Sequence, residues 1–209
     1  ALAVAKELFA LITTEPGMRP VLIRNGDYFL GLRRRVELAR ESKADLFISI
    51  HADAYPTSNR VHGSTVYMLS RSGASNEAAQ WLADKENSAD LIGGIKLHDK
   101  DELLATVLLD LMQAGTLEAS ARAGSSILKA LKTVGNNHYT AVQQANFMVL
   151  RSPEIPSILV EIAFLSNPAD EKNLNNSDYR RHTAQAIFEG MREYFTTHPL
   201  LNSLLAHRE

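Results

Sequence analysis

The chain has 209 residues, of which 45 % are hydrophobic and 22 % charged, a composition typical of a single globular domain. This composition excludes a disordered tail, a collagen-like repeat and a coiled-coil rod, and no apolar run approaches the roughly 18 residues that span a bilayer. The net charge of −2 gives no electrostatic reason to expect nucleic-acid binding. There is no cysteine, so any metal must be held by histidines and carboxylates.

Helical and strand patterns alternate along the chain. Apolar residues at helical spacing predict helices over residues 2–12, 30–43, 75–87, 101–113, 115–134 and 176–197. Short, nearly continuous apolar runs predict strands over residues 20–24, 46–50, 65–69, 147–150 and 157–160. The alternation predicts an α/β fold with a mainly parallel central sheet flanked by helices, into which a helical segment is inserted.

The first predicted helix begins without a cap. No Ser, Thr, Asp or Asn precedes its apolar positions, although such residues usually start a helix. We therefore expect the biological chain to start further upstream.

The segment SIHAD, at residues 49–53, places a histidine at the end of a predicted buried strand. His51 follows the apolar run directly, at the edge where ligands bind in open α/β sheets. A neutral imidazole in that position is a natural zinc ligand. The alternative is a histidine that closes the strand through a hydrogen bond.

The segment SILVEIAFLSN, at residues 157–167, places a glutamate at the end of a second predicted strand. A carboxylate at Glu161 is costly in such apolar surroundings unless it is paired or linked to a metal. Burial also raises the pKa of a carboxyl group, which suits a general base or acid near neutral pH. The alternatives are a helix cap or an internal salt bridge.

The other basic candidates carry weaker signals. Arg33, Arg34 and Arg35 lie on a predicted helix, so at most one or two of them point inward, and they are interpreted as its solvated face. The remaining histidines show no ligand spacing such as HxxxH and are interpreted as surface or hydrogen-bonded side chains: His62, His98, His138, His182, His198 and His207.

Two further motifs accompany these segments: RNGDYFLGLRRR at residues 24–35 and GSTVYMLS at residues 63–70. In this order, and with SIHAD and VEIAFLSN, they resemble the zinc-dependent N-acetylmuramoyl-L-alanine amidases of the amidase-3 family. The resemblance extends from residue 1 to about residue 195. The stretch NSADLIGGI resembles the periplasmic cell-division amidases of Gram-negative bacteria.

The resemblance implies hydrolysis of the amide between N-acetylmuramic acid and L-alanine in peptidoglycan, with Zn²⁺ held by two histidines and one glutamate. His51 matches one of these histidines, and Glu161 matches the family's catalytic glutamate. The motifs of the other two ligands do not occur in the chain, so we expect them, together with the first strand, upstream of Ala1. The expected catalytic domain covers residues 1–199, followed by a tail at 200–209.

The resemblance also implies regulation. We expect the inserted segment, about residues 76–113, to be an autoinhibitory lid whose Glu86 fills the open position on zinc; otherwise Glu86 belongs to a solvated helix face. The expected protein is a periplasmic monomer that acts in daughter-cell separation. Peptidoglycan is its expected substrate and a LytM-domain protein its activator, with no nucleic acid and no transmembrane segment.

Two other interpretations remain open. One is a zinc-free pseudoenzyme that binds peptidoglycan or a division partner. The other is a zinc carboxypeptidase, which would need an arginine such as Arg24 or Arg35 in the pocket to bind a substrate carboxylate. The polar residues Asp53 and Asn167 are assigned no role.

Overall fold

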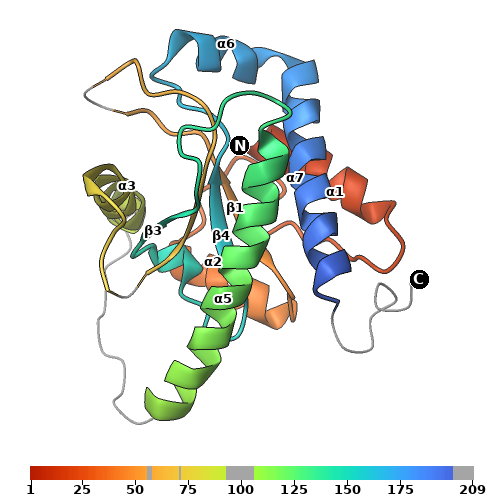
Figure 1. Ribbon diagram of the computed structural model, residues 1–209, viewed down its shortest axis with the longest axis vertical. Helices are drawn as coiled ribbons and strands as arrows, with labels where there is room; N and C mark the ends of the chain where they lie inside the picture. Colours follow the sequence, from red (N-terminus) through yellow and green to blue (C-terminus); the bar gives the residue numbers. More distant parts are fainter. Residues whose placement is uncertain (56–57, 71, 93–105, 200–209) are drawn as a thin grey trace.

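The computed structural model describes residues 1–55, 58–70, 72–92 and 106–199 (Figure 1). Within these ranges one sheet has the strand order β1-β4-β2-β3, formed by β1 (Phe47–His51), β2 (Thr65–Leu69), β3 (Gln143–Ala145) and β4 (Ser157–Glu161). The pairs β1–β4 and β2–β3 are parallel, whereas β2 and β4 are antiparallel. The predicted α/β fold with a mainly parallel sheet is confirmed.

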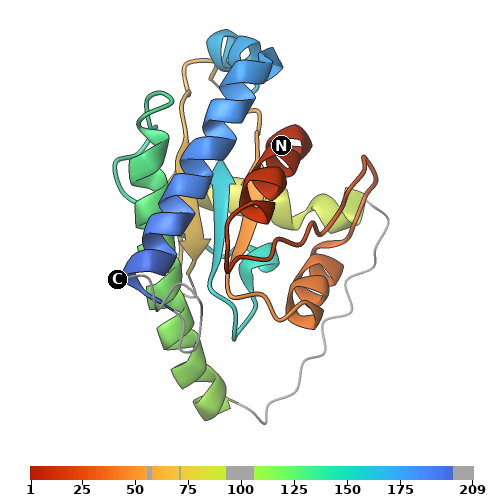
Figure 2. The same cartoon turned by 90° about the vertical axis from the view of Figure 1, so that its right-hand side faces the viewer.

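Helices cover both faces of this sheet (Figures 1 and 2). One face packs against α1 (Leu2–Thr13), α5 (Thr106–Leu131) and α7 (Ser177–Thr197). The other face packs against α2 (Leu32–Glu41), α3 (Glu77–Asn87) and the 3-10 helix η1 (Met148–Leu150). The short α4 (Ala89–Ile92) follows α3, and α6 (Pro168–Asn175) lies beyond the carboxyl end of β4. No helix of the described part is both long and apolar enough to cross a membrane.

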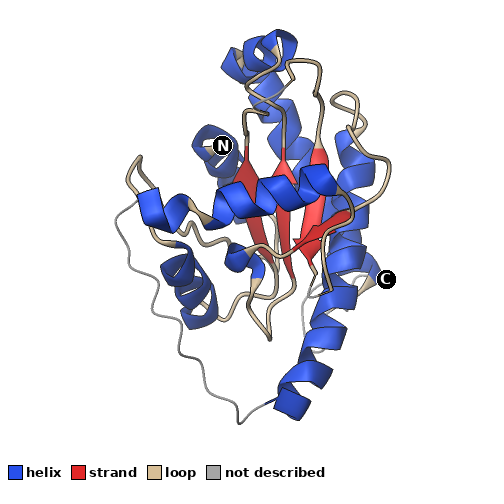
Figure 3. Cartoon of the chain, turned by 90° about the vertical axis from the view of Figure 1, so that its left-hand side faces the viewer, coloured by secondary structure: helices blue, strands red, loops and turns tan. Residues whose placement is uncertain are grey.

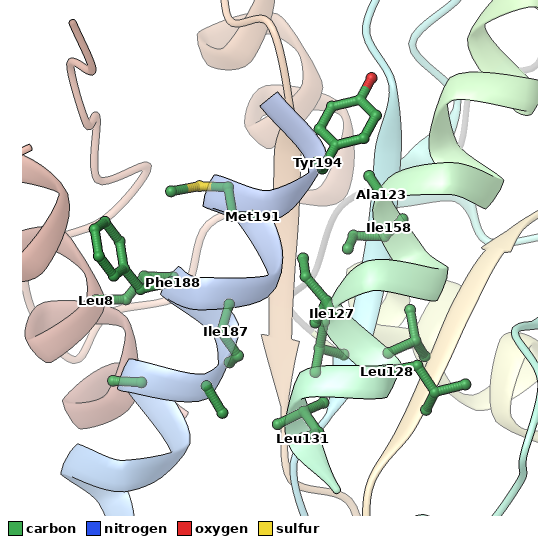
Figure 4. Packing of buried hydrophobic residues seen from close by; sticks show 14 of the residues in the cluster. Leu8, Ala123, Ile127, Leu128, Leu131, Ile158, Ile187, Phe188, Met191 and Tyr194 are labelled. Atoms are coloured by element: carbon green, nitrogen blue, oxygen red, sulfur yellow. The ribbon is translucent and has the colours of Figure 1, made fainter. Parts of the chain in front are cut away.

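The central strands explain the continuous apolar runs in the sequence. All five residues of β2 and of β4 are buried, because helices cover both of their faces. On the α1–α5–α7 face, Ile127 of α5 and Ile187 of α7 are fully buried between the helices and the sheet (Figure 4). Gly190 lets α7 approach α5 closely, since a Cβ atom there would lie 2.5 Å from the Cα atom of Ile127.

The predicted strand over residues 20–24 is wrong. These residues have no strand conformation, and β1 pairs with β4 alone among the strands that the structure describes. A cavity of about 600 Å³ is lined by residues 17–24, by β1 and by α1. A strand needs a neighbour that accepts its backbone hydrogen bonds, and none of the described residues supplies one to residues 20–24.

Other boundaries also differ from the predictions. Residues 148–150 of the predicted strand 147–150 form η1, and the strand that pairs with the outer side of β2 comes earlier, at β3. The predicted helices 101–113 and 115–134 are one continuous helix from Thr106 to Leu131, because Gly115 does not interrupt it; residues 101–105 lie outside the described residues. Helix α6 was not predicted, although Asn167 caps it and Pro168 starts it.

Candidate active site

Strand pairing brings the two predicted functional residues together. In the parallel β1–β4 ladder, His51 is the direct register partner of Glu161. Both residues end their strands, so both lie at the carboxyl edge of the sheet, where α/β folds usually bind ligands. His51 and Glu161, which are 110 positions apart in the sequence, thus lie side by side because β1 and β4 are neighbouring strands.

Glu161 is fully buried. Its Oε2 atom accepts a hydrogen bond from the backbone nitrogen of Asp53 at 3.1 Å, while Oε1 has no hydrogen-bond partner among the described residues. Burial, and then the nearby carboxylates of Asp53 and Glu86, raise the pKa of Glu161 well above its usual range. Such a carboxyl group can hold a proton near neutral pH and can also give it up, as a general acid and base must.

The imidazole of His51 is held from both sides. Its Nδ1 atom lies 3.1 Å from Oε2 of Glu86, and its Nε2 atom lies 2.9 Å from the hydroxyl of Ser49. Burial, the largest single cause, would raise the pKa of Glu86, but His51, Asp53 and Lys85 together outweigh it and the pKa falls. Glu86 is therefore an ionised carboxylate placed against the candidate metal ligand.

The residues present fit a metal ion. His51, Asp53 and Glu86 each offer one ligand atom, and these atoms lie within 4.8 Å of one another. Tetrahedral zinc with bonds of 2.0–2.1 Å holds its ligand atoms about 3.3 Å apart, close to the 3.1 Å between His51 and Glu86. The buried Oδ2 of Asp53 and Oε1 of Glu161 lack hydrogen-bond partners in the described structure. Nitrogen and oxygen donors next to unsatisfied carboxylate oxygens are the environment that Zn²⁺ accepts.

Helix α3 crosses one face of the sheet close to this edge (Figure 3). Besides the Glu86–His51 contact, Lys85 Nζ lies 3.1 Å from Oδ1 of Asp53. One turn earlier, the ring of Trp81 contacts the ring of Tyr55, with centroids 5.1 Å apart. Alternate residues from the end of β1 onwards, at positions 51, 53 and 55, thus each contact α3.

Polar contacts fix both ends of α3. Asn76 caps the helix and donates a hydrogen bond to Oε1 of Gln143 at 2.9 Å. At the other end, Asn87 donates to the carbonyl of Asn146 at 2.8 Å and accepts from the backbone nitrogen of Met148 at 2.7 Å. The contacts orient the helix so that Glu86 faces His51.

The segment after α3 is also tied to the domain. Asp90 of α4 is buried and accepts a hydrogen bond from the backbone nitrogen of Leu32, at the start of α2. Arg24 and Arg35 line the 600 Å³ cavity together with His51 and Glu86. Two positively charged guanidinium groups therefore lie in the same cavity as the candidate site.

Sequence reasoning missed part of this arrangement. Asp53 was assigned no role, yet it contacts both Glu161 and Lys85. The period-2 spacing of positions 51, 53 and 55 is the signal that could have grouped these residues on one face. Asn167, also without an assigned role, caps α6 and donates to the carbonyl of Asn59.

Comparison with known proteins gives the family. Residues 1–193 match the family model Amidase_3, described as N-acetylmuramoyl-L-alanine amidase. The chain is 44 % identical over 194 residues to the N-acetylmuramoyl-L-alanine amidase AmiA of Escherichia coli, covering 93 % of this chain and 66 % of that protein. It is 44 % identical over 181 residues to AmiC of Neisseria meningitidis, covering 87 % and 43 % respectively. The chain therefore spans less than two thirds of the length of these curated relatives.

Solved structures share the fold. The amidase AmiC2 of Nostoc punctiforme superposes with a TM-score of 0.62 at 25 % identity, over 93 % of this chain and 81 % of that chain. An N-acetylmuramoyl-L-alanine amidase of Clostridium difficile superposes with a TM-score of 0.67 at 22 % identity, over 93 % and 81 % of the two chains. The resemblance carried by the sequence motifs is confirmed, and the chain belongs to the amidase-3 family.

Proposed function

We propose that this chain is the catalytic part of a zinc-dependent amidase that cleaves the bond between N-acetylmuramic acid and L-alanine in peptidoglycan. The observation that carries the proposal is the direct pairing of His51 with the fully buried Glu161 at the carboxyl edge of the sheet. Membership of the amidase-3 family and the names of the relatives supply the substrate. The pairing supplies a metal ligand and a proton carrier side by side.

In this proposal His51 holds zinc together with a histidine and a glutamate that precede residue 1 in the whole protein. When bound, zinc lowers the pKa of a water molecule to about 7 and polarises the scissile carbonyl. Glu161 accepts the proton of the attacking water and passes it to the nitrogen of the departing L-alanine. The bond from the backbone nitrogen of Asp53 fixes Oε2 of Glu161, which leaves Oε1 to carry the proton.

We further propose that the cavity beside β1 receives a strand that precedes residue 1 in the whole protein. The cavity has the free edge of β1 and residues 17–24 among its walls, and the mostly apolar segment 20–24 pairs with none of the described strands. An inserted strand would pair with β1 on one side and with residues 20–24 on the other. It would end at the same edge of the sheet as His51, where the additional ligands are needed.

The segment about 76–113 is, in this proposal, an autoinhibitory lid with α3 as its blocking element. Three contacts support this: Glu86 lies against the ligand atom of His51, Lys85 pairs with Asp53, and Trp81 packs on Tyr55. With Glu86 in that place, water and substrate cannot occupy the same position on the metal. Residues 93–105 of this segment lie outside the described residues.

An activator must then displace α3 before hydrolysis. We propose a LytM-domain protein in this role, a periplasmic location and a part in daughter-cell separation, because the segment NSADLIGGI resembles that of the cell-division amidases and AmiA of Escherichia coli is a 44 % identical relative. We expect the protein to act as a monomer.

The amidase is tested with the full-length protein on purified peptidoglycan sacculi. Glu161→Gln keeps the size of the side chain but removes the base, so release of soluble peptides is expected to fall about 10²- to 10⁴-fold while the fold is kept. His51→Ala is expected to remove most of an otherwise stoichiometric zinc content. Near-normal peptide release by Glu161→Gln, or full zinc content in His51→Ala, refutes the proposed roles. A zinc-free chain that binds sacculi without cleaving them indicates the pseudoenzyme.

The lid is tested by deleting residues 76–113 from the full-length protein and measuring hydrolysis without activator. The deletion is expected to raise hydrolysis above that of the intact protein, and Glu86→Ala to raise it in the same direction. The deletion combined with Glu161→Gln is the control for contaminating hydrolases. A folded deletion variant that is no more active than the intact protein rules out the lid.

A further inference from the structure

The side chain of Ser49 points at the candidate metal ligand. Residues 49 and 51 are two apart on β1, so their side chains lie on the same face of the sheet. The hydroxyl oxygen of Ser49 lies 2.9 Å from Nε2 of His51, and Ser49 itself is only 7 % exposed. A buried hydroxyl needs a hydrogen-bond partner, and among the described residues the imidazole of His51 is the partner of this one.

The contact has a chemical consequence for the imidazole. A neutral histidine carries a proton on one ring nitrogen and a lone pair on the other, so the nitrogen that binds a metal is set by where the proton sits. When the hydroxyl of Ser49 accepts from Nε2–H, the lone pair lies on Nδ1; when the hydroxyl donates to Nε2, the proton lies on Nδ1. Nδ1 is the atom that faces Oε2 of Glu86 at 3.1 Å, in the group of possible ligand atoms formed with Asp53.

We propose that Ser49 is a positioning residue: it holds the ring of His51 with Nε2 protonated and Nδ1 directed at the metal. The inference rests on the proposed role of His51 as a zinc ligand. Histidine ligands of metals usually donate their second N–H to a carboxylate, a backbone carbonyl or a water, and here a serine hydroxyl takes that place.

A hydroxyl suits this site better than a carboxylate would. It can accept from Nε2–H when Nδ1 binds a metal, and it can donate to Nε2 when Nδ1–H donates to Glu86. It also adds no charge to a site that already contains the carboxyl groups of Asp53, Glu86 and Glu161. Ser49 can therefore support His51 both with α3 in place and with the metal exposed.

The test measures zinc affinity of the full-length protein by competition with a chromogenic chelator. Ser49→Ala is expected to weaken zinc binding about 10- to 100-fold, the usual effect of removing such a partner. Ser157→Ala is the matched control, because Ser157 is also a buried strand serine but its hydroxyl donates to the carbonyl of Ile155. The control is expected to bind zinc as tightly as the wild type.

A second measurement reads the ring directly. Long-range ¹H–¹⁵N spectra of the histidine-labelled, zinc-loaded protein are expected to show Nε2 of His51 protonated and Nδ1 bound to metal. Metal on Nε2, or zinc binding by Ser49→Ala within threefold of wild type, overturns the role of Ser49 alone. If the wild type takes up no zinc, or His51→Ala retains it, the proposed function fails and the role of Ser49 fails with it.

Discussion

The two faces of the sheet are covered in different ways. On one face, α5 and α7 pack through large aliphatic side chains such as Ile127, Leu131 and Ile187, which are completely buried. On the other face, α3 buries two alanines and one leucine, and its remaining contacts are hydrogen bonds, an aromatic pair and ion pairs. The α5–α7 layer is therefore held by the hydrophobic effect, whereas α3 combines a small apolar contact with several polar contacts to the site.

This difference indicates that α5 and α7 are needed for the domain to fold, whereas α3 covers the candidate site. Burial of large apolar side chains contributes about 1.5–3 kcal/mol each, so the α5–α7 layer cannot leave without unfolding the domain. Partly exposed polar contacts contribute about 1 kcal/mol or less each. A helix held in that way can separate from the sheet while the rest of the structure stays folded.

The largest expected effect compares a buried leucine in each layer. Leu131→Ala in α5 is expected to lower the free energy of unfolding by about 3–4 kcal/mol. Leu82→Ala in α3 is expected to lower it less, because the loss cannot exceed the free energy with which α3 is held on the domain. Chemical denaturation of both variants measures the two losses, and equal losses would contradict the distinction between the layers.

The next effect concerns close packing within the apolar layer. Gly190→Ala places a methyl group 2.5 Å from Cα of Ile127 and 2.8 Å from the carbonyl oxygen of Ser126, so we expect a loss of about 2–3 kcal/mol. Gly115→Ala in α5 has open space around the new methyl group and is expected to stabilise the helix by up to about 1 kcal/mol. Thermal melting of both variants should therefore give shifts of opposite sign. Shifts of the same sign would show that the helix contact is not tight.

The smallest effect on stability is expected in the polar layer. Lys85→Met removes the pair with Asp53 and, since Lys85 is 38 % exposed, should change the free energy of unfolding by less than about 1 kcal/mol. It should nevertheless raise hydrolysis of sacculi without activator, because α3 loses one of its contacts with the site. Lys132→Met, at an exposed position beyond α5, is the control. Unchanged basal hydrolysis in Lys85→Met would show that the ion pair between Lys85 and Asp53 does not contribute to inhibition.

Sequence patterns predicted the elements whose environment is local or fully buried. The apolar runs of β1, β2 and β4 and the periodicity of α1 and α7 were sufficient to predict these elements. An element that is buried on one or both faces has apolar residues at a regular spacing, and this spacing is visible in the sequence. The run at 20–24 failed, since a strand also depends on a partner. The run at 147–150 failed because periodicity cannot distinguish a short buried strand from a short buried helical turn.

The candidate site was predictable to a similar extent. His51 and Glu161 each follow an apolar strand, and that position indicated ligand-binding residues before their pairing was known. Glu86 was selected from the resemblance and lies against His51, while its role remains a proposal. The contacts of Lys85 and Trp81 depend on how α3 is placed against the residues at the end of β1, which no local pattern records.

Native-state hydrogen exchange of the full-length, zinc-loaded protein tests the contrast between the two layers most directly. We expect the amides of α3 to exchange through a local opening whose free energy lies several kcal/mol below that of α7, and the amides of α7 to exchange only on global unfolding. Equal protection of α3 and α7, with both exchanging only on global unfolding, would contradict the claim that α3 is a removable cover over the site.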